Sequence, residues 1–160
     1  MGFLHSLVDV FSLSNMSAVS LQARRITIGR VVKPFLVSSI LNDTIMAQYY
    51  SDALTSAQTG LYNKANEQLT NIITICDRKR YTSTQYYALA YYGRGISIFH
   101  SMASMKGLPV ETLHQLATEC IADLALFRSL AKSYPHILSS IEYVESERVL
   151  DLVWDMLFEA

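Results

Sequence analysis

Charged residues, cysteine and proline are all scarce in this sequence, and each shortage excludes something. Charged residues form 17% of the chain and the net charge is −1, against about 25% charged residues in ordinary soluble domains. The chain therefore has no overall positive electrostatic field that would attract nucleic acid. Two cysteines, Cys76 and Cys120, are too few for a disulfide framework, and both lie in apolar helical patterns. We expect free thiols in a reducing compartment, the cytoplasm.

Long apolar runs are missing as well. The nearest candidate, residues 31–45, is interrupted by two charged residues and a proline, so no transmembrane helix is predicted. Residues 1–11 have neither a basic leading region nor a small-residue cleavage site, so no secretory signal is predicted. The first six residues match the N-myristoylation pattern through Gly2, but that pattern is too loose to predict lipidation.

The patterns that carry common chemistries are also absent. The histidines (His5, His100, His114 and His136) show no pair at the short spacing of a zinc site. There is no Gly-x-Ser-x-Gly nucleophile motif, and Gly93-Arg94-Gly95 lacks the third glycine and the preceding strand of a phosphate loop. We predict no catalytic residues, no metal and no cofactor, and therefore no enzyme.

Two charged clusters have ordinary explanations. The basic residues 78–80, followed by Tyr81, resemble a nucleic-acid contact, but they also suit the negative end of a helix dipole, and we expect helix termination. Glu142, Glu145 and Glu147 lie beside Arg148, and we interpret them as a solvated helix face.

What the chain does contain is apolar residues at helical spacing. With only three prolines and six glycines, and with weak strand signals, the fold class predicted is all-α. The predicted helices are 3–11, 18–32, one starting near Pro34, 44–59, 62–78, 84–105, 110–133 and 136–158. The breaks between the later helices are Gly60, the basic cluster 78–80, the stretch 106–109 and Tyr134-Pro135. The apolar set of the last helix is Ile137, Ile141, Val144, Val149, Leu152, Val153 and Leu157.

The two central helix pairs repeat a pattern of bulky and small residues. The first pair contains Tyr49-Tyr50, Ala53, Gly60-Leu61-Tyr62, Ala65 and Leu69. The second contains Tyr91-Tyr92, Gly95, Phe99, Cys120 and the closing Pro135. This resembles the tetratricopeptide repeat (TPR) family, and residues 90–96 look like that family's common Ala-Tyr-Tyr-Asn-Arg-Gly-Leu form.

The resemblance implies a TPR-like α-solenoid in one compact domain. Residues 46–135 form two TPR-like helix pairs, residues 136–160 a C-terminal capping helix, and residues 1–45 an N-terminal helical extension or a dimerisation arm. Three features depart from the family: a long connection at 102–118, a long second helix in the second pair, and Arg94 where an aliphatic residue is more usual.

In that family the first helix of each pair lines a concave groove that docks a peptide or helix of another protein. The resemblance therefore implies a non-enzymatic adaptor or scaffold. The groove candidates are Tyr50, Leu54, Ala57, Gln58, Tyr92, Ile96, Phe99 and His100. Two repeats are fewer than a stable array usually needs, so the flanking helices complete the core or the chain forms a homo-oligomer.

Two alternatives of other classes remain open at this point. One is an all-helical regulatory module, or a remote enzyme, with an enclosed pocket for a small ligand. The other is a protein that associates with a membrane surface through residues 1–36.

Overall fold

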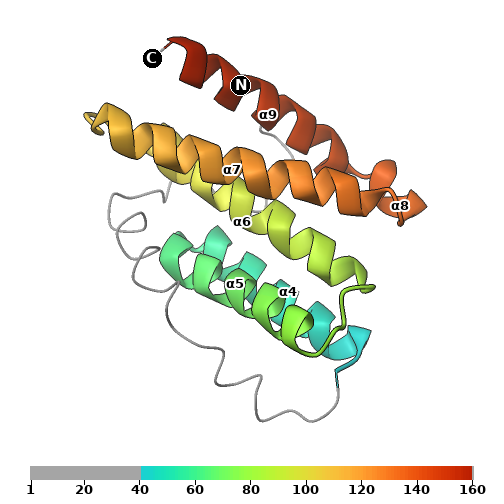
Figure 1. Cartoon of the computed structure of the whole chain (residues 1–160). Coiled ribbons are helices and arrows are strands. Elements are labelled where there is room, and N and C mark those ends of the chain that lie inside the picture. The colour runs from blue at the N-terminus through green and yellow to red at the C-terminus, as the bar shows by residue number, and fades with distance from the viewer. Residues whose placement is uncertain (1–40, 160) are drawn as a thin grey trace.

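The computed structural model describes residues 41–159, and in that part of the chain it contains α-helices and no strand (Figure 1). The all-α prediction is confirmed for this range. The helices are α4 (Asp43–Gln58), α5 (Tyr62–Arg78), α6 (Gln85–Ser104), α7 (Val110–Ala131), α8 (Pro135–Leu138) and α9 (Ile141–Glu159). The helices predicted before residue 41 lie outside the described residues.

The helices stack in chain order, from α4 and α5 at one end, through α6 and α7, to α9 at the other (Figure 1). Each long helix packs mainly on its neighbours in sequence, and α6 also contacts α4 and α9. Asp43, at the start of α4, accepts hydrogen bonds from Tyr81 and Thr84, which immediately precede α6. The starts of α4 and α6 therefore lie at the same end of the stack, and the two helices run in the same direction.

Two apolar clusters form the core, and α6 contributes to both. The first lies between α4, α5 and α6 and includes Met46, Leu69, Ile72, Cys76 and Ala90. The second lies mainly between α6, α7 and α9, includes Tyr92, Ile96, Leu116, Phe127 and Val153, and extends to Ala57 of α4 and to Tyr62 and Ala65 of α5. The middle helix thus joins the two halves of the stack.

The first two long helices end in the same way, with one residue in the left-handed region. Gly60 has a φ of 84°, and the amide of Leu61 donates to the carbonyl of Ser56 at 2.9 Å. The prediction that Gly60 ends this helix is confirmed. At the end of α5 the left-handed residue is Arg80, with a φ of 55°, and Tyr81 donates to Cys76 at 2.8 Å. Here a residue other than glycine takes the strained position.

One predicted helix is wrong. Apolar spacing predicts a single helix over residues 136–158, but α8 ends at Leu138 and α9 begins at Ile141. The hydroxyl of Ser140 causes the interruption: it donates to the carbonyl of Ile137 at 2.6 Å and accepts from the amide of Tyr143 at 3.3 Å. A serine at a helix start satisfies an amide that has no partner within the helix.

The middle helix comes very close to its neighbours at two glycines. A Cβ placed on Gly95 would lie 2.8 Å from Cδ2 of Leu124 in α7, closer than real Cβ atoms approach other atoms. A Cβ on Gly93 would lie 3.1 Å from Cδ1 of Leu69 in α5. Residues two apart on a helix point to roughly opposite sides. Gly93 and Gly95 therefore let α5 and α7 approach α6 from opposite directions.

We predict that Gly95→Leu abolishes cooperative thermal unfolding, because its side chain has no space beside Leu124. Gly95→Ala should lower the free energy of unfolding by about 1–3 kcal/mol, although alanine favours helix by about 1 kcal/mol over glycine. Adding Leu124→Ala should recover part of this loss, so the double variant is more stable than the sum of the single effects predicts. Unchanged melting of Gly95→Leu, followed by circular dichroism, would contradict the close contact.

Candidate functional site

The residues predicted to line a groove come together in space, but most are buried. Tyr92, Ile96, Phe99 and His100 of α6 are at most 5% exposed, and Tyr50 of α4 is 9% exposed. Ala57 is also buried, Leu54 is half-buried, and Gln58 is exposed. In this structure the set therefore belongs mainly to the core and offers a partner little open surface. A binding role for these residues stays a prediction.

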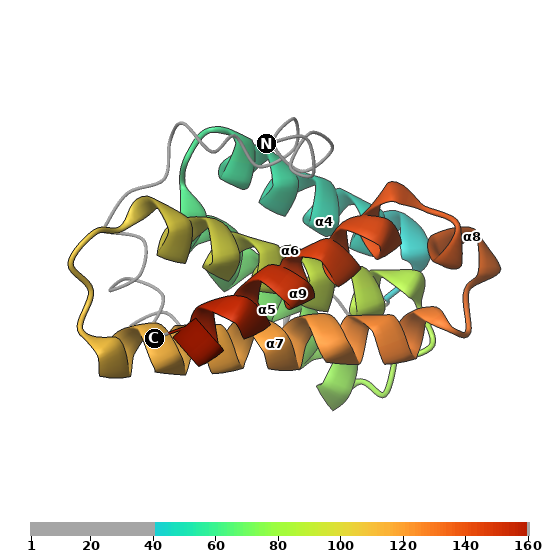
Figure 2. The same cartoon turned by 90° about the horizontal axis from the view of Figure 1, so that it is seen from above.

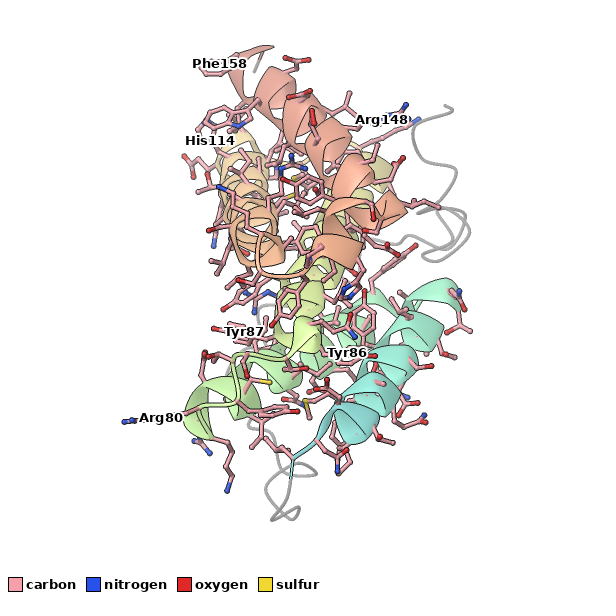
Figure 3. The ribbon with its side chains drawn as sticks, turned by 90° about the vertical axis from the view of Figure 1, so that its right-hand side faces the viewer. Arg80, Tyr86, Tyr87, His114, Arg148 and Phe158 are labelled. Atoms are coloured by element: carbon pink, nitrogen blue, oxygen red, sulfur yellow. The ribbon has the colours of Figure 1, made fainter. Side chains whose placement is uncertain are left out.

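The tyrosines of α6 divide between different surroundings. Tyr92 is buried against the ring of Phe127, with ring centroids 5.1 Å apart. Tyr87 and Tyr91 meet edge to face at 5.3 Å, and the Tyr87 hydroxyl donates to the carboxylate of Asp77 at 2.7 Å. Burial, together with the hydrogen bonds to Tyr91 and Asp77, raises the pKa of Tyr87. Tyr92 is therefore part of the core, whereas Tyr86, labelled in Figure 3, is half-buried.

Arg94, which departs from the repeat pattern, links three helices. Its guanidinium donates to both carboxylate oxygens of Asp123 in α7, at 2.9 and 2.8 Å, and to the hydroxyl of Thr70 in α5 at 3.3 Å. It also lies over the ring of Tyr91, 5.4 Å from the centroid. Burial alone would lower the pKa of Arg94, but the hydrogen bonds and charge of Asp123 outweigh it and raise the pKa. The pair is therefore a structural clamp, and no pattern in the sequence pointed to Asp123 as the partner.

The acidic cluster of α9 is not the uniformly solvated face that was predicted. Glu147 is exposed, but Glu145 is buried, 3.7 Å from the guanidinium of Arg148. Glu145 faces inward because α9 packs on α6 and α7, which places one side of the cluster in the interior. Burial raises the pKa of Tyr92, and the charges of Glu142 and Glu145 raise it further.

Arg128 of α7 holds α9 in place. Its guanidinium donates to the Tyr143 carbonyl at 2.8 Å and to the Ser146 hydroxyl at 2.9 Å, and it lies 3.9 Å from the Tyr143 ring centroid. It also approaches Glu147 at 3.8 Å. These contacts fix which side of α9 faces the interior and which side faces outward.

Four of the eight exposed large apolar side chains among the described residues lie on the outward side of α9. These are Ile141 (60%), Val144 (52%), Trp154 (44%) and Phe158 (80%). The rings of Trp154 and Phe158 stack, with centroids 5.5 Å apart and planes 16° apart. Exposed charged residues share the same side, namely Glu147, Arg148, Asp151 and Asp155. We call these four apolar and four charged residues the α9 outer face; Figure 3 labels Arg148 and Phe158 on it.

The opposite end of the stack is polar. The exposed residues of α4 are Asp43, Thr44, Gln48, Ser51, Asp52, Thr55 and Gln58. These side chains face solvent and remain hydrated.

Helical spacing predicts Ile141 and Val144 in the apolar set of a capping helix, but both are exposed. Of that set, Ile137, Val149 and Val153 are buried. In Figure 2, which looks down on the α9 end of the stack, no other described helix covers α9.

Among the described residues, no group of three or more His, Cys, Asp or Glu side chains is placed to hold a metal ion. Both cysteines are buried, and burial, with nearby acids, raises the pKa of Cys76 to about 12. That thiol is therefore protonated at neutral pH and is a poor nucleophile. No helix in the described range is long and apolar enough to cross a membrane.

Comparisons of the chain with protein-family models, with curated proteins and with solved structures found no match.

We predict that His100 makes stability depend on pH. Burial lowers its pKa to about 3, from about 6.5 in an unfolded chain. Between these values the unfolded state binds more protons, so the free energy of unfolding should fall as the pH falls below about 6.5. This contribution amounts to at most about 1.4 kcal/mol per pH unit.

His100→Gln removes the titrating group, so urea denaturation between pH 7 and pH 4 should show a smaller loss of stability for this variant. Exposed His114 provides the matched control, and His114→Gln should keep the wild-type pH dependence. If the free energy of unfolding falls equally steeply with falling pH in His100→Gln and in the wild type, His100 is not the source of the pH dependence.

Proposed function

We propose that the protein is a non-enzymatic adaptor of TPR-like architecture that binds a helix of another polypeptide chain. The α9 outer face is the surface that receives this helix. The observation that carries the proposal is the exposure of Ile141, Val144, Trp154 and Phe158 on one side of a terminal helix. Exposed apolar side chains that gather on one face are a common feature of interaction surfaces.

The helix order supports the same interpretation. In the first pair α5 packs against α4, and in the second pair α7 packs against α6. The next long helix, α9, follows the same sequence of antiparallel packing, but no later helix of the described chain covers its outer face. A helix supplied by another chain would cover α9 much as α5 covers α4.

The charges on the α9 outer face indicate the chemistry of that helix. Glu147, Asp151 and Asp155 give three acids against one base, Arg148. An amphipathic helix with an apolar stripe flanked by lysine or arginine complements this surface. The same acids disfavour an anionic membrane, to which basic amphipathic surfaces bind. A polypeptide partner therefore fits the face better than a lipid surface does.

Trp154 is the only tryptophan, and it lies within the proposed surface, so its fluorescence reports binding directly. The probe is a synthetic helix of about 18 residues with a leucine stripe and lysines on its flanks. We predict a blue shift of Trp154 emission on titration. The same peptide with glutamate in place of lysine should bind about tenfold more weakly, because its charges oppose those of the face.

Val144→Ser should weaken binding of the lysine peptide without changing the melting temperature, because Val144 is already exposed. Leu61→Ser is the matched control, since Leu61 is 47% exposed but lies between α4 and α5. Binding that is insensitive to Val144→Ser, or no emission shift with any peptide, would overturn the proposal.

A further inference from the structure

We infer that a cluster of tyrosine and glutamate side chains on the inward side of α9 binds a primary ammonium group, either that of a lysine side chain or that of a free amine. The cluster consists of Tyr50 of α4, Tyr92 of α6, and Glu142 and Glu145 of α9. We call these four residues the tyrosine–glutamate cluster. None of them belongs to the α9 outer face, so this site and the proposed adaptor function are independent of each other.

Three helices that run in the same direction bring the cluster together. α4 and α6 start at the same end of the stack, and α9 starts there as well, because the ring of His136, shortly before α9, lies 2.7 Å from the side-chain oxygen of Gln85 at the start of α6. In Figure 3, α4 and α9 lie toward the same side of the stack, and α5 and α7 toward the other. The first turns of α9 are therefore level with the first half of α6, on the side where α4 lies.

The two tyrosines meet at the contact between α4 and α6. Cε1 of Tyr50 lies 3.7 Å from the Cβ position of Gly93, the neighbour of Tyr92 in sequence. Tyr92 is 1% exposed, and its ring is packed 5.1 Å from that of Phe127. The Tyr92 hydroxyl is buried and has no hydrogen-bond partner among the described residues. A buried polar group without a partner is costly, so a ligand that supplies the missing hydrogen bond would be stabilised there.

The two glutamates approach this hydroxyl from α9. Glu142, Glu145 and Val149 share one side of the helix, at positions i, i+3 and i+7, and Val149 is buried in the same apolar cluster as Tyr92. Burial raises the pKa of Tyr92, and the nearby Tyr50 and both glutamates raise it further. Burial also raises the pKa of Tyr50, and the charge of Glu142 adds to that effect. The carboxylate of Glu142 is therefore close enough to act on hydroxyls from two other helices.

The two acids of the cluster have little positive charge beside them. α4 contains no basic residue, and Arg94, the basic residue of α6, is directed to Asp123 on the α7 side. Arg148 approaches Glu145 at 3.7 Å, but its side chain is half exposed. Glu142 is half-buried and forms no ion pair within the described part of the chain. A partly buried acid without a cationic partner is a position at which a bound cation is stabilised.

A primary ammonium group matches the chemistry of the cluster. It carries three hydrogen-bond donors and no acceptor, and the cluster offers acceptors in the carboxylate of Glu142 and the hydroxyl oxygen of Tyr92. The rings of Tyr50 and Tyr86, with centroids 6.0 Å apart, supply aromatic surface for a cation. Tyr50 is 9% exposed and Glu142 is half-buried, so the cluster meets solvent at these two residues. A quaternary ammonium group could contact the rings there, but it has no N–H to donate to the Tyr92 hydroxyl.

The test titrates the full-length chain with n-butylammonium chloride by isothermal calorimetry. Tetramethylammonium chloride is the matched cation without N–H groups and should bind at least about tenfold more weakly. Glu142→Gln and Tyr92→Phe should each weaken butylammonium binding by at least about tenfold, because each removes one partner of the ammonium group. Tyr92→Phe should not lower the melting temperature of the unliganded chain, because the hydroxyl that it removes has no partner. Glu147→Gln is the matched control, since Glu147 is an exposed acid of the same helix, and it should leave binding unchanged.

Equal binding of the two cations overturns the site, and so does butylammonium binding that survives Glu142→Gln and Tyr92→Phe. Two further probes distinguish the sources of the ammonium group. Tighter binding of Nα-acetyl-lysine amide than of 1,5-diaminopentane assigns the site to a lysine side chain, and the reverse order assigns it to a free amine. Val144→Ser, which tests the α9 outer face, should leave ammonium binding unchanged. The two proposals therefore stand or fail separately.

Discussion

The arrangement depends on the close approach of α6 to the helices on both sides of it. At Gly95 there is no room for even one methyl group beside Leu124, and at Gly93 there is little beside Leu69. Between these glycines Arg94 forms a two-fold hydrogen-bonded ion pair with Asp123 and reaches Thr70. Contact at van der Waals distance along a helix, with one directional ion pair, fixes both the spacing and the register of α5, α6 and α7. The core on either side of α6 then follows from ordinary apolar packing.

A stack built in this way must end, and its two ends are different. At one end α4 presents polar side chains to solvent, so the addition of another helix would bury groups that water already satisfies. At the other end Arg128 orients α9 so that Val149 and Val153 face inward while Trp154 and Phe158 face outward. No other described helix covers the apolar side chains on the outer side of α9. That asymmetry is the reason why we propose α9, rather than the residues of the predicted groove, as the binding surface.

Local signals in the sequence predicted the helices well and their contacts less well. Gly60 and the cluster ending at Arg80 terminate helices because backbone conformation there is decided by neighbouring residues. The break before α9 was missed because apolar spacing continues through it, although Ser140 is an ordinary capping residue. Helical spacing predicts which residues share a side of a helix, but not whether that side meets another helix. Hence Phe99 and His100 were placed in an open groove although they are buried, and Ile141 was placed in the core although it is exposed. The partner of Arg94, 29 residues away, could not be found from spacing alone.

Native-state hydrogen exchange tests most directly whether α6 is the element on which the other helices depend. The amides of the central turns of α6, around Gly95, should exchange only through global unfolding, with the highest protection in the described chain. Those of α4 and α9 should exchange through smaller, partial openings, because each packs on α6 from one side. Protection around Gly95 that is lower than that of α4 or α9 would contradict the account, since the terminal helices would then be stable without the contact assumed to hold them.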